Sequence, residues 1–189
     1  MNADVERILI SQRQIEKKVR ELGRRITNDY ADKTPVIISV LKGSIVFVAD
    51  LIRMMNCPCE IDFMIVSSFG SGVVSTGAVS IVKDLSISVE DRDVLVVEDI
   101  LDSGATLNYL KELLASRKPR TFKICTLLDK PARRTVDIKP GYIGFTIPDE
   151  FVVGYGLDYA ELYRNLPYIG VLKPSVYTPE HKEQLGLSE

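Results

Sequence analysis

The sequence has few of the residues and segments from which several common kinds of protein are built. Its 189 residues include only three cysteines and one histidine. Three cysteines cannot all pair within one chain, which favours a reducing compartment. No apolar run approaches the length of a membrane span, and the first residues lack a signal-peptide pattern. We therefore expect a cytoplasmic protein with no membrane partner.

Two further absences argue against particular ligand sites. Cys57 and Cys59 invite a metal hypothesis, but the only histidine is the distant His181 and no second cysteine pair completes a tetrahedral zinc site. The sequence also has no Gly-x-x-x-x-Gly-Lys-Ser/Thr run, the pattern of kinase-like and other Walker-type nucleotide sites. We expect neither a structural zinc nor a P-loop.

An excess of positive charge is also missing. The chain has 24 Lys and Arg against 26 Asp and Glu, a net charge of −2. Proteins that bind nucleic acids usually gather their basic side chains on one surface. The doublets Arg24-Arg25 and Arg133-Arg134 are too short for this role. We expect no nucleic-acid partner.

What is present indicates one α/β domain. The length and the 46% of hydrophobic residues suit a single domain with a sizeable core. Between Ser11 and Tyr30 apolar residues recur at helical spacing, and Ser11 with Gln14 forms a capping-box pattern. Strands are expected at 35–41, 61–66, 79–82, 94–97 and 122–128, and helices at 43–55 and about 105–115. Two short apolar segments follow at 142–145 and 151–153. This order predicts a mainly parallel sheet flanked by helices.

The most informative segment runs from Val94 to Leu107. Its β-branched start predicts a buried strand over 94–97, with Glu98 and Asp99 at its carboxyl end, where open α/β sheets bind ligands. The small residues from Ser103 to Thr106 then lead into a helix N-terminus, whose free amides suit a phosphate. Adjacent acids at the end of a buried strand are costly unless they bind something. A phosphate site beside an acid pair that can hold a diol indicates a ribose 5-phosphate.

This segment closely resembles the signature of the purine phosphoribosyltransferases. The resemblance implies that Glu98 and Asp99 hold the ribose hydroxyls of phosphoribosyl pyrophosphate. Asp102 would join them at the ribose phosphate, and the 5-phosphate would be held by Ser103, Gly104, Ala105 and Thr106.

The resemblance extends from about Val36 to Arg164 and is closest to the bacterial-type hypoxanthine-guanine phosphoribosyltransferases. It implies the type I phosphoribosyltransferase fold as a single domain over residues 1–189. A small hood would be formed by the N-terminal segment and the region after about residue 140. It also implies a homodimer or a homotetramer.

The loops that follow other strands add further ligands by resemblance. Lys42 and Gly43 match a loop that contacts pyrophosphate and contains a non-proline cis peptide, and Arg164 matches a second pyrophosphate ligand. Lys130 matches the lysine that donates to the exocyclic oxygen of a 6-oxopurine, and Arg134 an arginine that supports its loop.

The same resemblance covers the purine and the metal. Phe151 would stack on the base, Val152 would read its edge through the backbone, and Asp158 would lie beside them and contact Mg²⁺ through water. Glu98 and Asp99 would complete the Mg²⁺ surroundings. Ser68-Phe69 matches the flexible loop over the site, where the family usually has Ser-Tyr, so any role of the tyrosine hydroxyl is lost.

These residues predict an enzyme of purine salvage. It would transfer the phosphoribosyl group to hypoxanthine, and also to guanine, and release pyrophosphate, with Asp102 as the general base. One alternative is a transferase for xanthine, adenine or a pyrimidine. Asp102 and Lys130 argue against adenine, because lysine only donates and suits an oxygen acceptor. The other alternative is a nucleotide-sensing RNA-binding regulator on the same fold, which the net charge disfavours.

Overall fold

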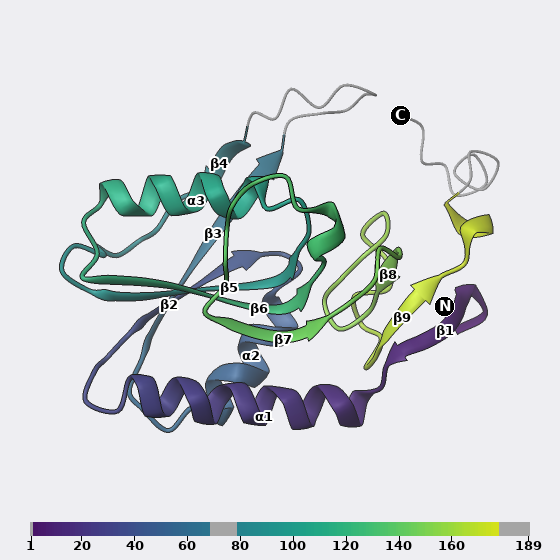
Figure 1. The fold of residues 1–189 in the computed structure, drawn as a ribbon, viewed down its shortest axis with the longest axis horizontal. Coiled ribbons are helices and arrows are strands. Elements are labelled where there is room, and N and C mark those ends of the chain that lie inside the picture. Colours follow the sequence, from purple (N-terminus) through teal and green to yellow (C-terminus); the bar gives the residue numbers. More distant parts are fainter. Residues whose placement is uncertain (1, 69–78, 178–189) are drawn as a thin grey trace.

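The computed structural model describes residues 2–68 and 79–177 and contains two sheets (Figure 1). The larger sheet has six strands in the order β4-β3-β2-β5-β6-β7, all parallel except the β3–β4 pair. Its strands are β2 (Val36–Leu41), β3 (Glu60–Ser68), β4 (Val79–Lys83), β5 (Asp93–Leu101), β6 (Thr121–Asp129) and β7 (Tyr142–Thr146). This confirms the predicted, mainly parallel α/β fold.

Three helices cover the two faces of this sheet. Helices α1 (Gln12–Asp29) and α2 (Ile45–Met54) lie on one face, and α3 (Ala105–Ser116) lies on the other (Figure 1). The chain leaves β2 through α2 toward β3, and leaves β5 through α3 toward β6, in the opposite direction. The strand order therefore reverses between β2 and β5. Open α/β sheets bind ligands outside the carboxyl ends of the strands at such a point.

The first helix forms as its local sequence predicts. Ser11 caps α1, its side chain accepts from the Gln14 backbone amide, and the Gln14 side chain accepts from the Ser11 amide, which completes a capping box. The buried face of α1 consists of Ile15, Val19, Leu22, Gly23 and Ile26. A Cβ on Gly23 would lie 2.6 Å from Met54 Cβ, so the glycine permits the close approach of α1 to α2.

The second sheet contains three antiparallel strands in the order β1-β9-β8. They are β1 (Val5–Ile10), β8 (Val152–Val153) and β9 (Ile169–Leu172), and only β8 falls on an expected apolar segment, 151–153. Short 3₁₀ helices cover Asn2–Asp4, Pro131–Arg133 and Pro174–Val176. Strand β7 lies after residue 140 but pairs with β6 in the larger sheet. The division into one domain with a hood stays a prediction.

The central strand is longer than its sequence pattern indicated. The predicted strand ended at Val97, whereas β5 continues to Leu101 because β6 pairs with it as far as Asp129. Its pairing with β2 ends at Ser39 and Val97. The acid pair therefore lies in the second half of the strand, on a stretch that pairs with β6 but not with β2. No described helix is long and apolar enough to span a membrane.

Candidate active site

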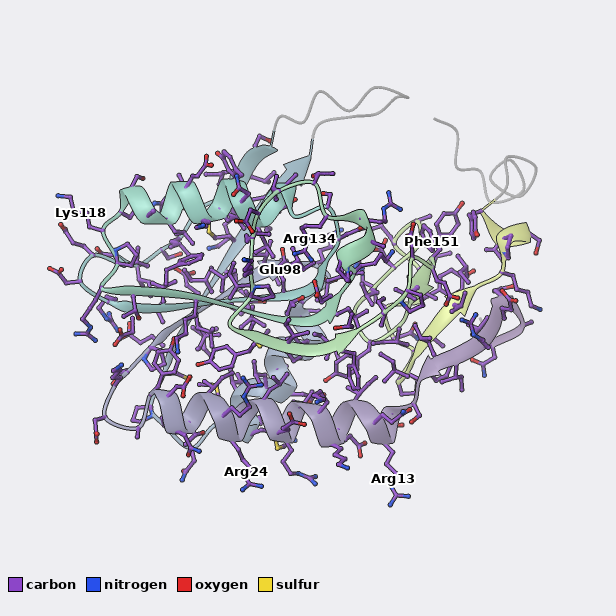
Figure 2. All side chains as sticks on the ribbon, viewed as in Figure 1. Arg13, Arg24, Glu98, Lys118, Arg134 and Phe151 are labelled. Atoms are coloured by element: carbon purple, nitrogen blue, oxygen red, sulfur yellow. The ribbon has the colours of Figure 1, made fainter. Side chains whose placement is uncertain are left out.

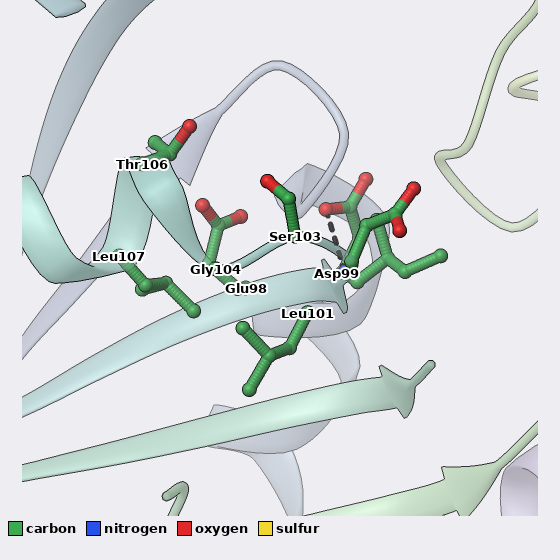
Figure 3. A pocket seen from close by; sticks show the side chains of 9 residues that line it. Glu98, Asp99, Leu101, Ser103, Gly104, Thr106 and Leu107 are labelled. Carbon is green, nitrogen blue, oxygen red and sulfur yellow. Dashed lines mark hydrogen bonds between the residues drawn. The ribbon is translucent and has the colours of Figure 1, made fainter. Parts of the chain in front are cut away.

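A cavity of about 250 Å³ opens at the carboxyl end of β5 and the start of α3. It is lined by nine of the ten residues from 98 to 107: Glu98, Asp99, Ile100, Leu101, Asp102, Ser103, Gly104, Thr106 and Leu107. Figure 3 shows the carboxylates of Glu98 and Asp99 and the hydroxyls of Ser103 and Thr106 around this cavity, with Leu101 and Leu107 on its apolar side. Of the predicted sugar and phosphate ligands, only Ala105 does not line it.

The turn before α3 has the backbone form of an anion site. Gly104 is the N-cap residue and has a φ of +87°, in the left-handed region that glycine adopts readily. A Cβ there would lie 2.8 Å from Val136 Cγ2. The first amides of a helix have no acceptor within the helix, and they point at the cavity together with the positive end of the helix dipole. The Ser103 hydroxyl accepts from the Ala105 amide at 3.4 Å, which closes the turn.

The two acids are held in an environment that disfavours their charge. Glu98 is buried and Asp99 partly buried. Burial raises the pKa of Glu98 well above its ordinary value, and the neighbouring Asp99 charge adds to the shift. Burial also raises the pKa of Asp99. The hydrogen bond from the Ile100 amide and the nearby Arg164 charge lower this pKa, but only in part. Two costly carboxylates beside a phosphate turn indicate that a cationic or hydroxylated ligand completes the site.

We expect Glu98→Gln to raise the melting temperature at neutral pH. The pKa of Glu98 is higher in the folded protein than in the unfolded chain, so its contribution to stability is complete below the ordinary pKa and is lost as pH rises through the folded value. Each pKa unit corresponds to about 1.4 kcal/mol, or about 3–6 °C in melting temperature for a domain of this size.

Thermal melts of the two proteins between pH 5 and pH 7.5 measure this effect. The difference between them should grow with pH. The control is Glu112→Gln, on the exposed side of α3, which should change the melting temperature little at either pH. If Glu98→Gln is less stable than the parent at pH 7.5, the expected destabilising effect of the buried Glu98 charge is contradicted.

Asp102 lines the cavity, and the two oxygens of its carboxylate have different surroundings. Its Oδ1 atom is buried and forms no hydrogen bond, although the Arg133 Nε atom lies 3.2 Å away. Its Oδ2 atom lies 3.8 Å from the Lys130 ammonium, which is itself buried and also lies 3.6 Å from Asp149 Oδ1. The predicted general base and the predicted purine ligand therefore lie side by side.

Arg134 holds the end of β5 against the loop that follows β6. Its guanidinium donates to the Asp102 carbonyl at 3.1 Å, to the Leu101 carbonyl at 3.3 Å and to the Ile138 carbonyl at 2.9 Å, and it pairs with the Asp129 carboxylate. Figure 2 shows Glu98 and Arg134 inside the molecule, with Phe151 on the side of the small sheet. As the resemblance implied, Arg134 supports the loop that carries Lys130.

The loop after β2 brings the predicted pyrophosphate ligands to the same edge of the sheet. The Leu41-Lys42 peptide bond is cis, as the resemblance implied. A Cβ on Gly43 would lie 1.8 Å from Asp99 Oδ2, so the glycine leaves room for the acid. Gly156 packs against this loop from the other side, because a Cβ there would lie 2.0 Å from the Gly43 carbonyl oxygen.

Arg164 forms the second half of this region. Its Nη1 atom donates to the Gly156 carbonyl at 2.8 Å and pairs with Asp158 Oδ1 at 2.8 Å. Its Nη2 atom donates to Glu161 Oε2 at 3.2 Å, and Lys42 donates to that same oxygen at 3.0 Å. The Arg164 Nε atom is buried without a hydrogen-bond partner. The two cations thus meet at Glu161, and the Arg164 charge acts on the Asp99 carboxylate.

Two of the predicted purine ligands, Phe151 and Val152, lie on the side of the small sheet. Phe151, which its apolar character alone would assign to the core, is 42% exposed. Its ring stacks on Tyr177 with centroids 5.2 Å apart and meets the edge of Tyr159 at 5.7 Å. Val152 is buried in β8. Ser68 is the last residue of β3, and Phe69 lies outside the described residues.

Three charged residues at this site were missed in the sequence analysis: Glu161, Arg133 and Asp149. Glu161 lies three residues after Asp158 and three before Arg164, a spacing that could have drawn attention to it. Asp149 carried no local signal, because only the fold brings it to Lys130. The roles of the predicted site residues stay predictions.

Known proteins resemble this chain closely. A model of the phosphoribosyl transferase domain matches residues 6–160. The hypoxanthine-guanine phosphoribosyltransferase of Bacillus subtilis is 59% identical over 177 residues, which cover 94% of this chain and 98% of that protein.

Solved structures agree. The hypoxanthine phosphoribosyltransferase of Staphylococcus aureus has a TM-score of 0.91 and 53% identity, over 94% of this chain and 97% of that one. A variant of the Trypanosoma cruzi hypoxanthine phosphoribosyltransferase, in a ternary complex with substrates, has a TM-score of 0.88 and 41% identity, over 93% of this chain and 100% of that one. The chain therefore belongs to the phosphoribosyl transferase family and, within it, is an enzyme of the hypoxanthine-guanine phosphoribosyltransferase group.

Proposed function

We propose that the enzyme transfers the 5-phosphoribosyl group of phosphoribosyl pyrophosphate to hypoxanthine and guanine in purine salvage. The products are IMP or GMP and pyrophosphate. The observation that carries this proposal is the cavity at residues 98–107, where a buried acid pair and a helix N-terminus line the same space. An acid pair can accept hydrogen bonds from vicinal hydroxyls, and the helix amides can donate to a phosphate.

In the proposed complex, Glu98 and Asp99 hold the ribose hydroxyls. The amides and hydroxyls of residues 103–106 hold the 5-phosphate. Lys42 and Arg164, with the Gly43 backbone, bind the pyrophosphate of the substrate and stabilise its growing charge as it leaves. Since the cations come from two separate loops that meet at Gly156, they can bind both phosphates of one leaving group.

The base is bound on the other side of Asp102. Phe151 offers an exposed ring for stacking, and the Val152 backbone and Asp158 lie beside the base. Lys130 is buried next to Asp102, and its ammonium only donates, so it selects the 6-oxo group of hypoxanthine or guanine over the amino group of adenine.

The chemical step follows from these positions. A nitrogen of the base forms the new bond to the anomeric carbon, and the bond to pyrophosphate breaks with its electron pair on the leaving oxygen. The imidazole part of the base loses its proton to the Asp102 carboxylate, which lines the cavity. General-base assistance of this kind contributes about 10²- to 10⁴-fold in rate.

The residues present fit a Mg²⁺ ion bound mainly through the substrate. Glu98, Asp99 and Asp158 supply carboxylate oxygens, and burial of the acid pair favours a compensating cation. Among residues 2–68 and 79–177, no cluster of three His, Cys, Asp or Glu side chains could hold a metal by itself. Mg²⁺ prefers water and substrate phosphates to such cages. When bound, it neutralises charge on the pyrophosphate.

We further propose that the chain works in the cytoplasm as a homodimer or homotetramer. Its three cysteines are all free thiols, as a reducing compartment would keep them. Light scattering after size-exclusion chromatography measures the assembly state. A monomer would contradict this part of the proposal.

The purified protein with phosphoribosyl pyrophosphate and Mg²⁺, offered one purine at a time, tests the function. Hypoxanthine and guanine should be converted, and xanthine is included for comparison. Adenine should be left unchanged, because its 6-amino group offers Lys130 no oxygen acceptor. Chelation of Mg²⁺ is the matched control and should abolish turnover. A preference for adenine would overturn the proposed substrate.

A further inference from the structure

Glu161 occupies the two cations to which the proposed function assigns the pyrophosphate. Its Oε2 atom accepts from Lys42 Nζ at 3.0 Å and from Arg164 Nη2 at 3.2 Å. These two donors belong to loops that are 122 positions apart in sequence. A carboxylate oxygen that accepts from both imitates the oxygen of a phosphate group, for which the same donors are suited.

The backbone around Glu161 fixes this arrangement. Ala160, Glu161 and Tyr163 have φ angles of +51°, +65° and +74°, in the left-handed region that residues other than glycine rarely adopt. The Glu161 amide donates to Asp158 Oδ2 at 2.9 Å, and Tyr159 and Leu162 bond each other through their backbones. The turn therefore directs the Glu161 carboxylate at the cations.

Exposure allows this contact to be exchanged. The side chains of Lys42 and Glu161 are 64% and 63% exposed. Ion pairs with this exposure are screened by water and contribute little to stability, so a phosphate that carries several charges can displace the carboxylate. By contrast, Asp158 pairs with Arg164 where the two side chains are only 30% and 23% exposed.

We propose that Glu161 is a positioning residue that stands in for pyrophosphate in the empty enzyme and is displaced when the substrate binds. It holds Lys42 and Arg164 together before binding. It then competes with pyrophosphate for the same donors and so speeds the release of this product. The inference rests on the proposed function, specifically on Lys42 and Arg164 as pyrophosphate ligands.

Calorimetric titration of the full chain with Mg²⁺-pyrophosphate tests the inference. We expect Glu161→Gln to bind pyrophosphate about two- to five-fold more tightly at low salt, the range of one exposed ion pair. The KM for phosphoribosyl pyrophosphate should fall in step, and product inhibition by pyrophosphate should strengthen. The gain should shrink at 0.5 M salt because screening weakens the competing pair.

A matched control and a second variant separate this role from a merely structural one. Glu60, the first residue of β3, forms another exposed ion pair, with Arg92. Glu60→Gln removes this carboxylate and should leave pyrophosphate binding unchanged. Glu161→Ala should act in the same direction as Glu161→Gln. Unchanged or weaker pyrophosphate binding in both Glu161 variants would overturn the inference.

Two further variants distinguish the inference from the proposed function. Lys42→Ala and Arg164→Ala should each weaken pyrophosphate binding at least ten-fold if these residues are its ligands. If they do so while the Glu161 variants bind no more tightly, only the role of Glu161 fails. If they do not, the proposed pyrophosphate site itself fails.

Discussion

Asp102→Asn should lower kcat by about 10²- to 10⁴-fold while the KM values for both substrates change little. The variant keeps the size of the side chain but cannot accept a proton from the base. One carboxylate oxygen of Asp102 is buried without a hydrogen bond, so loss of the charge removes only ion pairs, with Arg133 at 3.2 Å and Lys130 at 3.8 Å. Steady-state kinetics with hypoxanthine measure the effect.

Asp149→Asn is the matched control for this variant. Asp149 lies 3.6 Å from the Lys130 ammonium and 3.7 Å from Arg133, so its removal changes the same electrostatic surroundings as the loss of Asp102. Asp149 lies outside the cavity at residues 98–107, and its variant should change kcat by far less. Normal turnover in Asp102→Asn would exclude it as the base.

Gly156→Ala should destabilise the protein and also disturb pyrophosphate binding. Gly156 has a φ of +103°, where other residues are strained by about 1–3 kcal/mol, and the added Cβ would lie 2.0 Å from the Gly43 carbonyl oxygen. We expect a loss of about 3 kcal/mol or more in the free energy of unfolding, or about 6–12 °C in melting temperature. The KM for phosphoribosyl pyrophosphate should rise at least about ten-fold, because Gly156 also accepts from Arg164.

Gly141→Ala provides the comparison. The nearest atom to a Cβ on Gly141 would lie at 3.7 Å, an ordinary contact, and this glycine has no positive φ. Its melting temperature should stay close to that of the parent. Thermal melts and kinetics of the two variants, measured side by side, separate a general effect of losing a glycine from the contact at Gly43. Equal behaviour of the two would contradict the proposed packing.

The parts of the fold that could be predicted are those whose signals are local. Ser11 and Gln14 lie within one turn and predicted the start of α1, and the apolar run from Val94 predicted the central strand. The end of that strand was placed too early, because two of its last four residues, Glu98 and Asp99, are charged and this part of the strand depends on pairing with β6. Such pairing has no signature in the sequence of β5 itself.

The small sheet and part of the site were missed for a similar reason. Strands β1 and β9 pair across more than 150 residues, and two register shifts interrupt the pairing, so neither strand has a regular alternation to detect. Glu161 is an exposed acid in a turn of unusual backbone angles, which reads as a surface residue. By contrast, the adjacent acids Glu98 and Asp99 could be recognised from the sequence, because charged residues inside an apolar strand are rare.

Nine of the ten residues from Glu98 to Leu107 line the space proposed for the sugar phosphate, whereas the proposed base ligands Lys130, Phe151 and Asp158 lie on separate segments. The two tasks are thus modular. Substitutions in 130–133 and 151–158 should therefore change which base is accepted, while the binding of phosphoribosyl pyrophosphate is retained. Substitutions within 98–107, in contrast, alter the reaction for every acceptor at once.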